Sequence, residues 1–82
     1  MIINNELIEN EFLEIVRAAS KWDSIYSNFI SVGSICRETK YRYGDYDKDL
    51  VEGLIKRLER EGTIEAEYLD GMLLGVKRSA LS

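Results

Sequence analysis

Three aspartates at alternate positions, Asp45, Asp47 and Asp49, have the spacing in this chain that could best hold a metal ion. A calcium-binding loop starts with such a run and needs glycine at its sixth position, where the chain turns sharply. Counted from Asp45, the sixth residue is Leu50, and residues 50–56 carry the apolar stripe of a helix. We therefore interpret these aspartates as helix-capping residues rather than calcium ligands.

The composition offers little to catalytic chemistry. The 82 residues contain no histidine, the commonest general base and transition-metal ligand, and one cysteine, Cys36. Ile35 and Arg37 flank this cysteine, which fits a small buried side chain. There is no nucleophile–base pair and no glycine-rich phosphate loop, and the chain is short for a deep pocket. We expect no enzymatic activity, no cofactor and no metal.

Charge is distributed unevenly along the chain. In total, 15 acidic and 11 basic residues give a formal charge of -4, which opposes non-specific binding to a polyanion. Residues 1–14 contain four glutamates and no base. The middle of the chain is basic, and between Arg37 and Tyr43 the bases alternate with tyrosines that could stack on nucleotide bases.

The sequence shows neither a membrane segment nor a secretion signal. No run approaches the roughly 20 apolar residues needed to cross a bilayer, and the amino terminus lacks a basic start followed by an apolar run. A single cysteine cannot form an intrachain disulfide. We expect one small domain over residues 1–82, located in the cytoplasm and not bound to membranes.

Two segments have the apolar spacing of amphipathic helices. The first covers residues 5–20. The second starts at Asp47 or Asp49 as its capping residue and is ended by Gly62 in the left-handed conformation. The first helix is expected to bury Ile8, Phe12, Ile15 and Ala19. The second is expected to bury Leu50, Val51, Leu54, Ile55 and Leu58.

The segment between these helices allows two readings. In the favoured reading, a short strand near residues 29–32 leads through Gly33 to Ser34, which caps a helix over residues 35–41. In the other, one helix covers residues 23–37. Gly33 favours the first, because glycine costs a helix about 1 kcal/mol relative to alanine. An exposed turn is predicted at residues 41–46.

A β-hairpin is predicted after the second amphipathic helix, with Asp70 and Gly71 in its loop. A two-residue loop would mix apolar and charged side chains on each face, whereas a three-residue loop starting at Leu69 gives one apolar face. The pairs expected from the longer loop are Tyr68 with Met72, Ala66 with Leu74, and Ile64 with Val76. The side chains then expected to point outward are Glu65, Glu67, Leu73 and Lys77.

From Ser34 to Arg78 the chain resembles the winged helix-turn-helix superfamily. Ser34–Arg37 looks like the opening of that family's second helix, and Leu50–Ile64 looks like its third helix and first wing strand. The resemblance covers about half of the chain and rests on core spacing. It implies a small α+β domain with three helices and a carboxy-terminal β-hairpin wing, with a further short strand near residues 29–32.

In DNA-binding members of this superfamily the third helix enters the major groove. The exposed face of that helix here carries Asp47, Asp49 and Glu52 besides two lysines, and acidic side chains are repelled by phosphates. We therefore expect a non-enzymatic protein-interaction module of the immunity, antitoxin, phage-inhibitor or adaptor type, whose acidic surface attracts a basic partner. Its candidate partner-binding residues are Asp49, Glu52, Lys56, Glu65, Glu67, Tyr41, Tyr43 and Tyr46.

The alternative is a DNA-binding transcriptional regulator. It would be a homodimer, because one small module with few bases would bind DNA weakly alone. The first helix and the carboxy-terminal Ala80 and Leu81 could supply the dimer contact. The candidate nucleic-acid-binding residues for this alternative are Arg37, Lys40, Arg42, Lys48, Lys56, Lys77 and Arg78.

Overall fold

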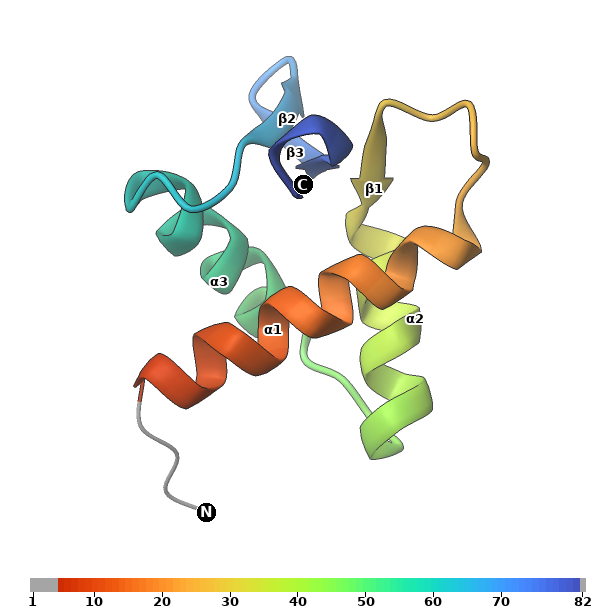
Figure 1. Ribbon diagram of the computed structural model, residues 1–82, viewed down its shortest axis with the longest axis vertical. Coiled ribbons are helices and arrows are strands. Elements are labelled where there is room, and N and C mark those ends of the chain that lie inside the picture. The colour runs from red at the N-terminus through yellow and green to blue at the C-terminus, as the bar shows by residue number, and fades with distance from the viewer. Residues whose placement is uncertain (1–4, 82) are drawn as a thin grey trace.

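The computed structural model describes residues 5–81, with side chains from residue 9 onward except that of Ala80 (Figure 1). The helices are α1 (Asn5–Ala19), η1 (Ser20–Trp22), α2 (Val32–Tyr43), α3 (Lys48–Arg60) and η2 (Arg78–Leu81), and η1 and η2 are short 3-10 helices. The strands are β1 (Phe29–Ser31), β2 (Ala66–Leu69) and β3 (Met72–Lys77). They form an antiparallel sheet in the order β1–β3–β2. The expected α+β arrangement of three helices, a carboxy-terminal hairpin and a further short strand is confirmed.

The core lies between the three helices and the sheet. Its buried apolar side chains are Phe12, Ile15, Val16, Ala19, Ile30, Val32, Ile35, Cys36, Val51, Ile55, Leu58, Ile64, Ala66 and Val76. This set includes the apolar positions predicted for the two amphipathic helices, with three exceptions. The side chain of Ile8 lies outside the described residues, and Leu54 is half-buried. Leu50, predicted to be buried, is exposed.

The ambiguous segment is a strand followed by a helix, but the predicted cap and bounds of the helix are wrong. Ser31, rather than Ser34, is the N-cap of α2, and its Oγ accepts a hydrogen bond from the N–H of Ser34 at 3.1 Å. Pairing of β1 with β3 holds Ser31 in an extended conformation, which an N-cap requires and which the local sequence does not reveal. Gly33 therefore lies in the first turn of α2, and the helix continues through Tyr43 into the predicted turn.

The ends of α3 follow the capping signals in the sequence. Asp47 is the N-cap, and its Oδ1 accepts hydrogen bonds from the N–H groups of Asp49 and of the next residue at 3.0 and 3.2 Å. The alternative cap, Asp49, lies in the first turn instead. Gly62 has φ 80°, and the N–H of Thr63 donates to the carbonyl of Leu58 at 2.9 Å. These contacts form a Schellman motif, which satisfies carbonyls at the helix end.

The hairpin closes through a two-residue turn, so the predicted three-residue loop and its register are wrong. Asp70 and Gly71 both have positive φ, 51° and 79°, as in the type I′ turn that matches the twist of paired strands. A bulge between Glu67 and Tyr68 then shifts the register, so that Ala66 still faces the core opposite Val76. The observed pairs are Leu69 with Met72, Tyr68 with Leu73, Glu67 with Gly75, and Ala66 with Val76.

The bulge also changes which hairpin side chains meet the core. Leu73, predicted to point outward, is half-buried and packs against the core. Tyr68 and Met72, predicted to share the apolar face, are exposed. The physical reason is that the predicted pairs belong to a regular ladder, whereas the bulge allows a tight turn and an apolar inner face to coexist.

Gly75 allows β1 to approach β3 closely. A Cβ atom at this position would lie 2.0 Å from the carbonyl oxygen of Ile30. We expect Gly75→Ala to lower the free energy of unfolding by about 1–3 kcal/mol, because β1 must move away from the sheet. Chemical denaturation measures this change. Gly53→Ala is the control, since an added Cβ there meets nothing within 4 Å and alanine favours the helix; equal destabilisation by both variants would contradict the β1–β3 contact.

Candidate functional site

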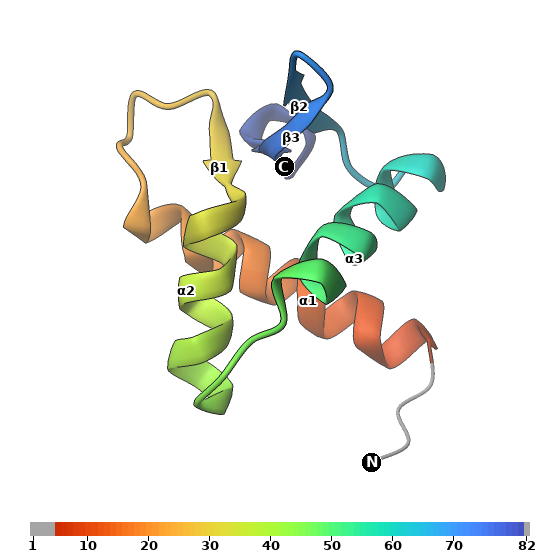
Figure 2. The same ribbon diagram turned by 180° about the vertical axis from the view of Figure 1, so that it is seen from behind.

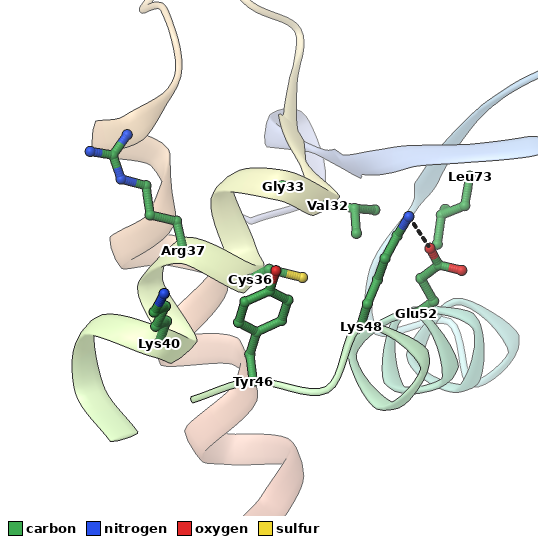
Figure 3. Close-up of a pocket in the computed structure, with 9 residues that line it drawn as sticks. All are labelled: Val32, Gly33, Cys36, Arg37, Lys40, Tyr46, Lys48, Glu52 and Leu73. Atoms are coloured by element: carbon green, nitrogen blue, oxygen red, sulfur yellow. Dashed lines mark ion pairs between the residues drawn. The ribbon is translucent and has the colours of Figure 1, made fainter. Parts of the chain in front are cut away.

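A hollow of about 470 Å³ opens between α2, the start of α3 and β3 (Figure 3). Its lining residues are Val32, Gly33, Cys36, Arg37, Lys40, Tyr46, Lys48, Glu52 and Leu73. Lys48 Nζ lies 3.8 Å from Glu52, the single acid in the lining, and Arg37 and Lys40 form no ion pair within the part of the chain that the structure describes. We call this surface the basic hollow, because its local charge is opposite in sign to that of the whole chain.

Cys36 contributes a buried wall to the basic hollow rather than a reactive group. Tyr46 lines the same hollow (Figure 3). Burial raises the pKa of the Cys36 thiol, which keeps it protonated and unreactive at neutral pH. The predicted buried position of this cysteine is confirmed.

The other candidate nucleic-acid-binding residues do not join the basic hollow. Arg42 donates to Glu38, and Lys77 lies 3.9 Å from Glu65 and 3.8 Å from Glu67 on the hairpin. The guanidinium of Arg78 donates to the carbonyls of Ser20 and Ser24, and Lys56 is exposed farther along α3. The structure therefore brings together three of the seven residues, Arg37, Lys40 and Lys48.

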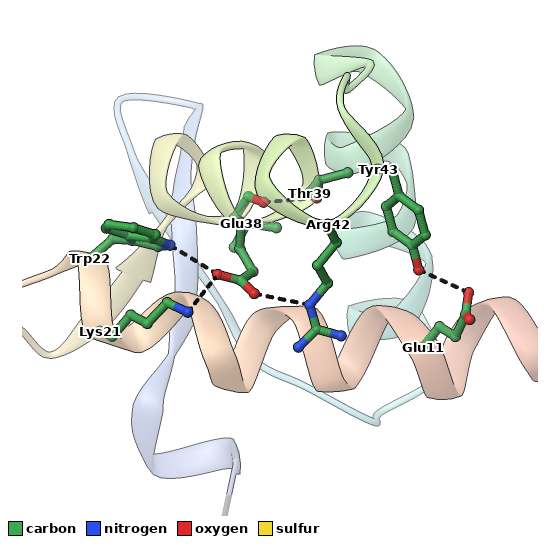
Figure 4. Close-up of polar contacts among 8 residues, drawn as sticks. Glu11, Lys21, Trp22, Glu38, Thr39, Arg42 and Tyr43 are labelled. Carbon is green, nitrogen blue, oxygen red and sulfur yellow. Dashed lines mark hydrogen bonds and ion pairs between the residues drawn. The ribbon is translucent and has the colours of Figure 1, made fainter.

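A buried carboxylate, which the sequence analysis missed, joins α2 to η1 (Figure 4). The Glu38 side chain is 2% exposed. Its Oε1 accepts a hydrogen bond from Trp22 Nε1 at 3.0 Å and lies 3.1 Å from Lys21 Nζ, and its Oε2 accepts from Arg42 Nε at 2.9 Å. The bond from Arg42 outweighs burial and lowers the pKa of the Glu38 carboxyl. Every charge here is paired inside the fold, which indicates a structural cluster.

The signal for this cluster in the sequence is incomplete. Glu38 and Arg42 have the i, i+4 spacing of a helical ion pair, but Lys21 and Trp22 come from a distant segment. Trp22 is half-buried and packs against the core. The guanidinium of Arg37 makes a cation–π contact with the Trp22 ring, with Cζ 4.0 Å from the ring centroid.

A second hollow, of about 410 Å³, opens between α1, the end of α2 and the start of α3. Its lining residues are Glu11, Phe12, Ile15, Thr39, Tyr43, Asp47, Leu50, Val51, Leu54 and Arg57. We call it the apolar groove. Leu50, expected in the core, is 61% exposed here, and Tyr43 is 58% exposed. Helical spacing placed Leu50 on the correct side of α3, but within the described residues no other element covers this side at its first turn.

The charged groups at the rim of the apolar groove are mainly acidic. Glu11 accepts a hydrogen bond from the hydroxyl of Tyr43 at 3.3 Å, and burial followed by this glutamate raises the pKa of that tyrosine (Figure 4). The single lining base, Arg57, lies 3.0 Å from Glu9 and 3.5 Å from Glu61. Because two acids compensate this base, the exposed carboxylates of Glu11 and Asp47 leave the rim negative.

The candidate partner-binding residues are spread over several surfaces. Tyr43 lies at the apolar groove, Tyr46 at the basic hollow, and Tyr41 beside Lys21, whose Nζ is 5.2 Å from its ring centroid. On α3, Asp49 and Lys56 are exposed and Glu52 is paired with Lys48, while Glu65 and Glu67 lie near Lys77. The structure does not bring this set together. The groove leucines, which it does bring together, had been predicted as core.

Comparisons with known proteins identify no relative. A scan against protein-family models, a search of curated proteins and a search of solved structures each found no match. Among residues 5–81, no helix is long and apolar enough to cross a membrane. No group of three or more histidine, cysteine, aspartate or glutamate side chains in that range is placed to hold a metal ion. The two hollows are therefore the features from which we infer function.

Proposed function

We propose that this chain is a non-enzymatic protein-interaction module with a winged-helix-like fold, and that the apolar groove docks a basic protein partner. The order of elements supports the fold assignment, since α2 and α3 are followed by a hairpin whose strand β3 pairs with a short β1. Immunity, antitoxin, phage-inhibitor and adaptor proteins act by such binding. The proposal needs no catalytic group and no cofactor.

The exposed position of Leu50 carries this proposal. A leucine that is 61% exposed contributes little to folding, and half-buried Leu54 and exposed Tyr43 extend the same apolar surface. Covering apolar surface is favourable by about 25 cal/mol for each Å² removed from water. A contiguous apolar surface with a polar rim is typical of a protein-binding site.

Charge selects the kind of partner. The chain has a formal charge of -4, and Glu11 and Asp47 make the rim of the apolar groove negative. Opposite charge on a partner speeds its encounter and fixes its orientation, and the effect is screened by salt. We therefore expect a basic partner whose association slows as the salt concentration rises.

Affinity capture from native cells tests this proposal with matched variants. Leu50 and Leu69 are both 61% exposed, but Leu69 lies on the hairpin, away from the apolar groove. We expect Leu50→Asp to abolish capture of the partner, whereas Leu69→Asp and nuclease treatment leave it unchanged. Aspartate suits the first turn of α3, where the helix dipole favours negative charge, so the fold is retained. Equal capture by both variants would contradict docking at the groove.

Duplex DNA binding is the second candidate function, and the basic hollow is the observation that favours it. Arg37, Lys40 and Lys48 line it, although the guanidinium of Arg37 is stacked on Trp22, and Tyr46 adds an aromatic ring. Acids on the exposed face of α3 oppose this function, so we expect weak DNA binding at physiological salt. Submicromolar, sequence-selective binding by the unmodified chain, lost in the Lys40→Ala, Lys48→Ala double variant, would make the DNA-binding regulator the better proposal.

The regulator would also require a dimer. Leu81, one expected dimer residue, is half-buried against the core, and the side chain of Ala80 lies outside the described residues. Covering Leu81 within its own chain reduces the apolar surface that it can offer to a second copy. Sedimentation analysis of the chain, with and without duplex DNA, measures the oligomeric state directly.

A further inference from the structure

We infer that the segment bound in the apolar groove is an amphipathic α-helix with lysine or arginine side chains beside its apolar face. The inference rests on the proposed function, and it specifies the conformation and charge of the partner segment. Three properties of the groove support it. Most hydrogen-bonding groups of its walls already bond within the fold, its length along α3 suits a short helix, and its rim is negatively charged.

The walls of the groove offer few hydrogen bonds to a peptide backbone. They consist of α1, the end of α2 and the start of α3, where most backbone groups bond within their own helix and the N–H groups of Asp49 and Leu50 bond the Asp47 side chain. The strands lie at the other end of the molecule (Figures 1 and 2). Wall side chains are engaged as well, since Thr39 Oγ1 donates to the carbonyl of Ile35 and the hydroxyl of Tyr43 donates to Glu11. An extended peptide would bury unpaired polar groups here, whereas a helix satisfies its own.

The length of the groove suits two turns of such a helix. Leu50, Leu54 and Arg57 line it at the i, i+4, i+7 spacing of one face of α3. At a rise of 1.5 Å per residue, these positions span about 10 Å. A helix packed against this face can place three apolar side chains, also at i, i+4 and i+7, over Phe12, Val51 and Leu54.

The charge of the rim indicates basic side chains on that helix. Glu11 on α1 and Asp47 at the start of α3 are exposed, and both line the groove. Arg57, the opposing base, is already bound to Glu9 and Glu61. A ligand helix with lysine or arginine beside its apolar face would therefore meet two carboxylates that form no ion pair within the described residues, whereas an acidic helix would be repelled.

A synthetic helical peptide tests the inference with the full chain. The probe is a fluorescently labelled amphipathic peptide of about 15 residues, with leucines at i, i+4 and i+7 and lysines flanking them. One comparison peptide has the same composition with its leucines spread around the helix, and another has glutamate in place of lysine. By fluorescence anisotropy, we expect the amphipathic lysine peptide to bind at least about tenfold more tightly than either comparison peptide.

Two variants of the chain separate apolar docking from simple charge attraction. Leu50→Asp is expected to weaken binding of the lysine peptide by at least about tenfold, although it adds a negative charge to the site. Leu69→Asp adds the same charge elsewhere and is expected to change binding by less than about twofold. Circular dichroism of both variants checks that the helices remain formed.

Four outcomes would overturn the inference, and each has a distinct meaning. Equal binding of the lysine peptide and its spread-leucine comparison, or stronger binding by Leu50→Asp, would show charge attraction alone. Concentration-dependent dimers that Leu50→Asp dissociates would make a second copy of the chain the occupant. If capture of the native partner depends on Leu50 but no helical peptide binds, the proposed function stands and the helical conformation of the partner segment is rejected. If neither partner capture nor peptide binding depends on Leu50, both the proposed function and the helical ligand are rejected.

Discussion

Replacing Leu58 with alanine is expected to lower the free energy of unfolding by about 2–5 kcal/mol. The Leu58 side chain is 0% exposed and lies in the core between α3 and the rest of the fold. Alanine removes buried apolar area and leaves a cavity that close-packed neighbours fill only in part. Small domains have unfolding free energies of about 5–15 kcal/mol, so this loss should unfold a measurable fraction of the protein.

Arg60→Ala is the control for this prediction, because Arg60 is exposed on the same helix. Glu59 is the nearer neighbour, but it holds the hairpin: its carboxylate accepts hydrogen bonds from Tyr68 Oη at 2.9 Å and from the N–H of Ala66 at 3.4 Å. Urea denaturation of both alanine variants measures the difference. Equal midpoints for Leu58→Ala and Arg60→Ala would show that the buried face of α3 has been assigned incorrectly.

Replacing Glu38 with alanine is expected to lower the free energy of unfolding by about 3 kcal/mol. The carboxylate joins Trp22, Lys21 and Arg42, so its loss removes polar links between η1 and α2 and leaves an indole N–H without its partner. The value lies at the low end for a buried ion pair, because the side chains of Lys21 and Arg42 are 52% and 33% exposed and can reach water. Glu65→Ala, at a surface pair, should have little effect.

The contribution of Glu38 should also depend on pH. The hydrogen bond from Arg42 lowers the pKa of the folded carboxyl below that of an unfolded glutamate, about 4.3. A lowered folded pKa gives stability that is fully present above the unfolded pKa and is lost as pH falls through the folded pKa. Denaturation of the unmodified protein and Glu38→Ala should therefore show a difference that shrinks below about pH 4. A constant difference from pH 7 to pH 3 would contradict an ionised, paired carboxylate.

Local sequence signals were sufficient to predict α1 and α3, because the residues that determine these helices lie within or next to them. Apolar spacing identified Phe12, Ile15, Ile55 and Leu58 as core, and capping signals limited the start of α3 to Asp47 or Asp49, of which Asp47 is the cap. The start of α2 could not be predicted from local signals alone. Two serines three residues apart can each cap a helix, and the choice of Ser31 depends on strand pairing with residues more than 40 positions away.

Long-range packing also explains why the predictions for Leu50 and for the hairpin register were wrong. Periodicity correctly put Leu50 on the apolar side of α3, but it cannot show whether another element reaches that turn. At the hairpin, the preference of Asp70–Gly71 for a tight turn outweighed a regular ladder, and the bulge absorbed the mismatch.

Methyl NMR of the chain bound to the protein it captures from native cells is the most direct test of docking at the apolar groove. We expect the methyl signals of Leu50, Val51 and Leu54 to shift or broaden on binding, because these side chains line the groove. The signal of Leu69 on the hairpin should stay unchanged. Shifts confined to Leu73 and its neighbours at the basic hollow, with the Leu50 signal unchanged, would contradict the proposal.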